Sequence, residues 1–177
     1  ALPAILPFLI SEHNLSYAAA AALVFAANMA SSVVQPLFGH LADRIASPWL
    51  MPAGVLFAGL GLSLTGFLED YWLLFAASTV SGIGIAAFHP EAARLANRVS
   101  GEKKATGVSF FAVGGNAGFA VGPVVTTVAL LTWGLKGTLI LIIPVIIMSV
   151  LLALKSREFH SFRPSGTVKA TAAVATA

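Results

Sequence analysis

Long uncharged stretches alternate with short charged ones along the chain. No Asp, Glu, Lys or Arg occurs in residues 13–42, 45–68, 71–90, 105–135 or 137–154. A helix needs about 20 apolar residues, each rising 1.5 Å, to cross the hydrocarbon core of a bilayer. Each stretch can hold one such helix. The pattern therefore predicts five complete membrane spans, at residues 17–38, 49–68, 71–88, 106–132 and 137–154.

The chain opens with the ten apolar residues "ALPAILPFLI". As a helix they would cover only about 15 Å, half of a bilayer core. A cleaved signal peptide is disfavoured because no basic region precedes them, there is no initiating Met, and Pro3 and Pro7 interrupt the apolar run. We expect the C-terminal half of a truncated first helix, which raises the number of spans to six.

Composition supports a membrane protein of the all-α class. The chain is 58% hydrophobic and only 10% charged, which is far more apolar than a soluble domain. It has no cysteine, so disulfides, thiolate metal sites and cysteine nucleophiles are excluded. A net charge of +3 that is confined to short loops reflects membrane topology and not nucleic-acid binding.

The basic residues fall almost entirely on one side of the predicted membrane. If the first helix runs outward, the inner side holds Arg44, Arg94, Arg98, Lys103, Lys104, Lys155, Arg157, Arg163 and Lys169. The outer side holds only Lys136. Lys and Arg favour cytoplasmic loops, so both ends of the chain are expected in the cytoplasm of a cell whose inner membrane it spans. Residues 1–154 would form the membrane domain, and the Ala/Thr-rich stretch 155–177 a linker.

Glycines recur every four residues in "GGNAGFAVGP", at Gly114, Gly118 and Gly122. The spacing does not match a phosphate-binding loop. Inside a membrane helix it places the glycines on one face, where another helix can approach closely. Pro123 should bend this helix. The face could serve two helices that slide against each other, or plain static packing.

Several polar residues are candidates for a path through the membrane. The uncharged ones are Asn28, Ser78, Ser81, Ser109 and Asn116. Serines often bond to their own helix backbone, so packing is an equal alternative for them. A buried amide needs partners, so Asn116 is either a site residue or a bond between helices.

His89 and Glu91 stand at the inner edge of the fourth span. Two ligands are too few for a metal site, so no metal is expected. Two roles remain for His89 and Glu91. One is a pH-sensitive or substrate-entry role, and the other is helix capping with lipid contact. Pro90 is expected to open a short helix that lies along the inner membrane surface.

The inner turn "GHLADR", from Gly39 to Arg44, resembles the Gly-x-Leu-Ala-Asp-Arg loop of the major facilitator superfamily. Gly118-x-x-x-Gly122-Pro123 is similar to that family's antiporter motif, and the stretch from "HPE" to "GGNAG" resembles its fosmidomycin-resistance branch. The resemblance implies the N-terminal six-helix half of a twelve-helix secondary transporter. It further implies proton-coupled export of a small molecule, with membrane lipid and a C-terminal half as partners and without a cofactor.

Asp43 would lie just after a helix end, where its carboxylate can accept backbone N–H groups of a neighbouring helix N-terminus. We expect Gly39, Asp43 and Arg44 to form a gate at the inner surface, with a solvated turn charge as the alternative for Asp43. No charged residue lies inside a predicted span, so proton coupling is supported by the resemblance alone. We expect a transporter and not an enzyme. Two alternatives to an exporter remain, an uptake porter and an intramembrane serine protease. The substrate is not identified by the sequence.

Overall fold

The computed structural model describes residues 2–44 and 49–161, without the side chains of residues 42–44, 157 and 159–161. This part of the chain forms six α-helices and one 3-10 helix, and it contains no strand. The elements are α1 (Leu2–His13), α2 (Tyr17–Arg44), α3 (Leu50–Leu64), α4 (Tyr71–Val99), α5 (Lys104–Trp133), η1 (Gly134–Leu141) and α6 (Ile142–Ser161). The predicted all-α class is confirmed.

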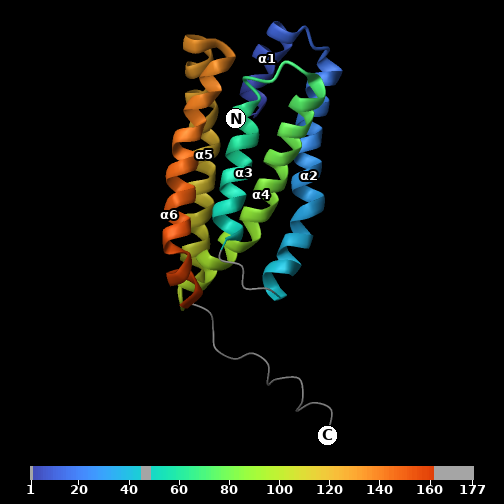
Figure 1. Ribbon diagram of the computed structural model, residues 1–177. Helices are drawn as coiled ribbons and strands as arrows, with labels where there is room; N and C mark the ends of the chain where they lie inside the picture. The colour runs from blue at the N-terminus through green and yellow to red at the C-terminus, as the bar shows by residue number, and fades with distance from the viewer. Residues whose placement is uncertain (1, 45–48, 162–177) are drawn as a thin grey trace, which may run out of the picture.

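The helices stand side by side in an upright bundle (Figure 1). The long helix α4 packs against both α2 and α3, and α3 also packs against α6. The short helix α1 occupies only the upper part of the bundle in Figure 1, where it contacts α5. The remainder of α5 therefore has no α1 beside it.

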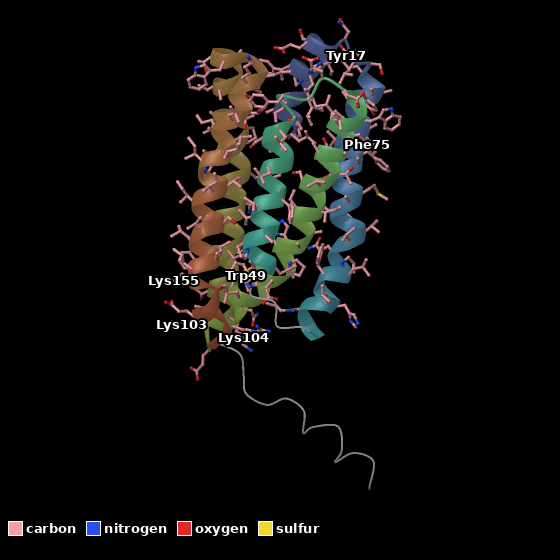
Figure 2. All side chains as sticks on the ribbon, in the orientation of Figure 1. Tyr17, Trp49, Phe75, Lys103, Lys104 and Lys155 are labelled. Atoms are coloured by element: carbon pink, nitrogen blue, oxygen red, sulfur yellow. The ribbon has the colours of Figure 1, made fainter. Side chains whose placement is uncertain are left out.

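The two ends of the bundle carry different charges. The connections α1–α2, α3–α4 and α5–η1 lie at the upper end in Figure 1 and bear Glu12, Glu69, Asp70 and Lys136. We call it the acidic end. Lys103, Lys104 and Lys155 lie at the opposite end in Figure 2, which we call the basic end. The predicted separation of charges is thus present in the described residues, while the side of the membrane that each end faces stays a prediction.

Small residues allow α4 to approach its neighbours closely. A Cβ added to Gly54 of α3 would lie 2.9 Å from the carbonyl oxygen of Gly84 in α4, and one added to Gly61 would lie 2.5 Å from that of Ala77. Across the same contact, the hydroxyl of Ser81 donates to the carbonyl oxygen of Ala58 at 2.8 Å. Packing and a hydrogen bond together hold α4 against α3.

Hydroxyl groups also join α3 to the last part of the chain. The buried Thr138 of η1 donates to the carbonyl oxygen of Ser63 at 2.7 Å, and Ser149 of α6 donates to that of Pro52 at 2.8 Å. An apolar cluster lies near the acidic end and consists of Ile5, Leu9, Leu23, Leu74, Leu130 and Leu135. This cluster packs α1, α2, α4, α5 and η1 together near the acidic end.

Three expected boundaries are wrong. The helix α2 continues to Arg44, so Gly39, Asp43 and Arg44 belong to its last turns and do not form a loop after residue 38. The helix α4 continues through Pro90 to Val99, so no separate surface helix begins there. Both are long enough to extend beyond a bilayer core, since 28 residues cover about 42 Å. Residues 155–161 of the predicted linker belong to α6, and its other residues lie outside the described part.

Three helical stretches are long and apolar enough to cross a membrane, at Tyr17–Leu41, Tyr71–Val99 and Lys104–Ser156. The last of them includes α5, η1 and α6, between which the chain turns at Gly134 with a φ of 60°. Leu50–Leu64 is apolar but shorter, at about 22 Å. The structure supports a membrane bundle, and the count of six spans stays a prediction.

Candidate functional site

Three of the sequence-predicted candidates meet in one cavity. His89 of α4 and Gly114 and Asn116 of α5 line a space of about 710 Å³ on the basic-end half of the bundle. The other lining residues are Phe88, Phe110, Phe111, Ala112, Gly115, Phe119 and Met148 of α6. The volume lies within the range of small-molecule sites in proteins.

The walls of this cavity are aromatic and uncharged. None of its lining residues is Asp, Glu, Lys or Arg. The ring of Phe88 meets the ring of His89 edge to face, with centroids 5.8 Å apart. An imidazole and an amide are therefore the only side chains there that form strong hydrogen bonds, and the rest of the surface offers apolar contact.

The amide of Asn116 is exposed and forms no hydrogen bond within the described part of the chain. Ser109, nearly two turns earlier on α5, donates to the carbonyl oxygen of Ala105 at 2.8 Å. The bond satisfies the hydroxyl inside its own helix. Asn116 thus keeps its full hydrogen-bonding capacity for a group that enters the cavity, while Ser109 has already used its only donor.

A second group of candidates meets at the basic end, through Arg94, which the sequence placed among the inner basic residues but not among the site candidates. Arg94 of α4 donates to the carbonyl oxygen of Gly39 in α2 at 2.8 Å and lies 3.4 Å from the carboxylate of Glu91. Both charged side chains are largely shielded from solvent, at 23% and 16% exposure. The arginine thereby fixes the last turns of α2 against α4.

The proximity of Arg94 to Glu91 follows from their spacing in the sequence, since residues three apart are neighbours on a helix. Its bond to Gly39 could not, because the two residues are far apart in the chain. The side chains of Asp43 and Arg44 lie outside the described residues, so the gate role of this pair stays a prediction.

The remaining polar candidates do not line the cavity. Ser78 and Ser81 are buried where α4 packs against other helices, and the hydroxyl of Ser78 has no hydrogen-bond partner in the described structure. Asn28 is exposed on α2. The structure therefore places the two serines in helix packing, and it does not bring Asn28 to the other candidates.

The glycine face of α5 has no partner helix within the described residues. A Cβ added to Gly114, Gly118 or Gly122 would meet nothing within 4 Å. The expected close approach of another helix to this face is therefore not found within the described bundle. Whether the face serves sliding or static packing against a further segment stays a prediction. Pro123 lies within α5, which continues to Trp133.

Long apolar helices with charges gathered at the two ends of the bundle define the class of multi-pass α-helical membrane proteins. The family model described as Major Facilitator Superfamily matches residues 1–176. The chain belongs to the Major Facilitator Superfamily, a family of transporters.

Two relatives have the same degree of identity to this chain. It is 32% identical over 158 residues to the Fosmidomycin resistance protein of Escherichia coli (strain K12). The matched region covers 89% of this chain and 39% of that relative. It is also 32% identical over 136 residues to the Uncharacterized MFS-type transporter YfnC of Bacillus subtilis (strain 168). Here the matched region covers 77% of this chain and 33% of the relative. The chain thus spans well under half the length of either relative. No solved structure matches it.

Proposed function

We propose that this chain is the N-terminal half of a secondary transporter that exports a small molecule from the cell in exchange for protons. Transport would proceed by alternating access, in which two halves rock around a site near the middle of the membrane. The observation that carries the proposal is the uncharged cavity in which His89 and Asn116 meet. The name of the Escherichia coli relative, which concerns resistance to fosmidomycin, supports export as the direction.

Further segments complete the cavity in this proposal. The helix α4 packs against α2 and α3, whereas α1 contacts α5 near the acidic end only. The basic-end half of α5 leaves Phe110 75% exposed and Phe119 82% exposed. Residues that precede Ala1 would continue α1 along this half of α5 and close the cavity on that side. A second half after residue 177 would supply the opposite wall, in keeping with the greater length of the relatives.

Two features are compatible with such a movement. They are the glycine face of α5, formed by Gly114, Gly118 and Gly122, and the bond from Arg94 to the carbonyl oxygen of Gly39, which we call the Arg94 bridge. A face without side chains can slide along a partner helix, and a bundle held rigid at its basic end can rock as one body. In the same proposal the basic end faces the cytoplasm, because most Lys and Arg lie there.

The test of function is transport by the full-length protein. Cells of a susceptible bacterium that express it should accumulate less fosmidomycin than cells with an empty vector. A protonophore should abolish the difference, since export would lose its driving force. Greater accumulation in the expressing cells would instead indicate an uptake porter. Equal accumulation would show that fosmidomycin is not a substrate.

The role of the cavity is tested by Asn116→Leu, with Ser109→Ala as the matched control on the same helix. The leucine removes the free amide and adds volume, so export should fall about tenfold or more, in line with the loss of one or two hydrogen bonds to a ligand. Ser109 bonds to its own helix, and its variant should transport normally. Normal export by Asn116→Leu at wild-type expression would show that substrate does not use this cavity.

One alternative activity has no support in the described geometry. An intramembrane serine protease needs a serine and a histidine in contact. Ser81 is bonded to the backbone of α3, and His89 lies eight residues further along α4, about 12 Å away along the helix axis.

A further inference from the structure

A second cavity, of about 470 Å³, lies at the acidic end, where three connections of the bundle meet. The end of α1 contributes Glu12 and His13, the α3–α4 connection contributes Phe67 and Glu69, and the α5–η1 junction contributes Trp133 and Lys136. We call these six residues the acidic-end cup. All three connections are described, so the cup is bounded by residues of this chain.

The charged groups of the cup are not used by the fold. Neither Glu12, Glu69 nor Lys136 takes part in an ion pair or a side-chain hydrogen bond with any described residue. By contrast, the nearby Asp70 caps α4 through a 3.0 Å bond from the N–H of Leu73. The two carboxylates of the cup outnumber its single ammonium group, so its potential favours a cation.

The position of Glu12 is supported by the turn that faces it. Gly134 ends α5 with a φ of 60°, in a region where L side chains are strained. A Cβ added there would lie 3.6 Å from Oε1 of Glu12. The carboxylate of Glu12 thus lies beside the α5–η1 turn, on the wall of the cup, although the residue is exposed to solvent.

His13 adds a polar atom that the fold leaves unsatisfied. Its Nε2 is shielded from solvent and has no hydrogen-bond partner among the described residues. A shielded nitrogen without a partner is costly, because it has lost water and gained nothing. An N–H group of a ligand would satisfy it when the imidazole proton is on Nδ1.

Two aromatic rings complete the cup. The side chains of Trp133 and Phe67 are 63% and 45% exposed. A cation placed over the face of an indole or phenyl ring is attracted by the ring quadrupole, and carboxylates beside the ring strengthen the attraction. An anion would meet two carboxylates here. A metal ion is disfavoured, because no cluster of three His, Asp or Glu residues within the described part could hold one.

We propose that the acidic-end cup binds a small molecule that carries a protonated amine, with Glu12 and Glu69 facing the ammonium group and Trp133 and Phe67 facing its apolar part. Lys136 sets the selectivity, since it disfavours molecules with two positive charges. The cup is at the opposite end of the bundle from the cavity of His89 and Asn116, whose α5 residues lie in the basic-end half. It is therefore separate in position from the cavity proposed for the transported substrate.

The test uses the full-length protein in nanodiscs of phosphatidylcholine, with benzylamine as the probe. Benzyl alcohol has the same ring and nearly the same size but no charge, and serves as the ligand control. Titration calorimetry or saturation-transfer NMR should show saturable binding of benzylamine at least about tenfold tighter than that of benzyl alcohol, as expected for a charge shared between carboxylates and rings.

The double variant Glu12→Gln with Glu69→Gln should weaken benzylamine binding about tenfold and leave benzyl alcohol unaffected. Glu102→Gln, the same change in an exposed residue beyond α4 at the basic end, should have no effect. Lys136→Gln should tighten binding about two- to threefold. The proposal is overturned by the absence of saturable benzylamine binding, by equal affinity for the two probes, or by a double variant that binds as Glu102→Gln does.

Discussion

At the scale of single residues, glycine has opposite roles in α4 and in α5. In α4, Gly82 and Gly84 touch the backbones of α2 and α3, so that any side chain there would overlap with atoms that cannot move aside. In α5, Gly114 and Gly118 face open space. The same residue type thus stabilises the bundle in one helix and leaves a bare surface in the other.

Gly84→Ala should therefore destabilise the bundle by about 1–3 kcal/mol, because a methyl group is forced against the backbone of Ala58. Gly118→Ala should leave stability unchanged or slightly raise it, since alanine favours helix and meets no neighbour. The measurement is the midpoint of thermal unfolding for chain 1–177 in detergent. Equal midpoints for the two variants would contradict the close approach of α4 and α3.

Arg94 is the residue through which α2 and α4 are joined at the basic end. Arg94→Gln removes a charge-assisted bond to the carbonyl of Gly39 and should cost about 1.5–3 kcal/mol locally. Hydrogen exchange should become faster in the last turns of α2, from about residue 36 onward. Arg98→Gln, one turn further along α4, is the control, since no bond of Arg98 is present among the described residues. Equal exchange in the two variants would mean that the bridge does not hold α2.

At the scale of elements, α5 is the helix with two different halves. Near the acidic end it is packed, with Thr126, Ala129 and Leu130 buried. Toward the basic end nearly every residue from Ala105 to Val121 is exposed, and this half carries the cavity and the glycine face. The basic-end half of α5 is thus a surface that no described residue covers.

Gly118→Leu should abolish export by the full-length protein while membrane insertion and expression stay normal. The leucine would occupy space that a partner helix needs, although it meets nothing within this chain. Val124→Leu enlarges an exposed residue about 120° away around the same helix and should be tolerated. Normal export by Gly118→Leu would indicate that the glycine face contacts lipid.

At the scale of the whole molecule, the charges at the two ends predict one orientation in the membrane. The absence of cysteine allows single cysteines to be introduced into chain 1–177. With the basic end in the cytoplasm, Glu69→Cys should react with a membrane-impermeant maleimide added to intact cells, whereas Glu102→Cys should react only after the cells are opened. The reverse labelling pattern would show that the chain has the opposite orientation in the membrane. The acidic-end cup would then face the cytoplasm.

Much of the candidate site was within reach of sequence reasoning. His89, Asn116 and the glycines of α5 were recognised because a polar group or a run of small residues is unusual within an apolar stretch. The aromatic walls, from Phe110 to Phe119, were not recognised, because phenylalanine is ordinary in a membrane helix and only its neighbours reveal a cavity. Arg94 was recognised as an inner basic residue, but its bond to Gly39 joins residues that are distant in the chain.

The sequence by itself determined the all-α membrane class, the family, and the separation of charges between the ends. These depend on composition, on the lengths of uncharged stretches and on local motifs, all of which are properties of neighbouring residues. Only the tertiary structure decided that Ser78 and Ser81 are packed, that the glycines of α5 are bare while those of α4 are covered, and that α2 and α4 continue past their expected ends. The face that a helix buries depends on which helix lies beside it, and that choice is made by contacts between segments far apart in the chain.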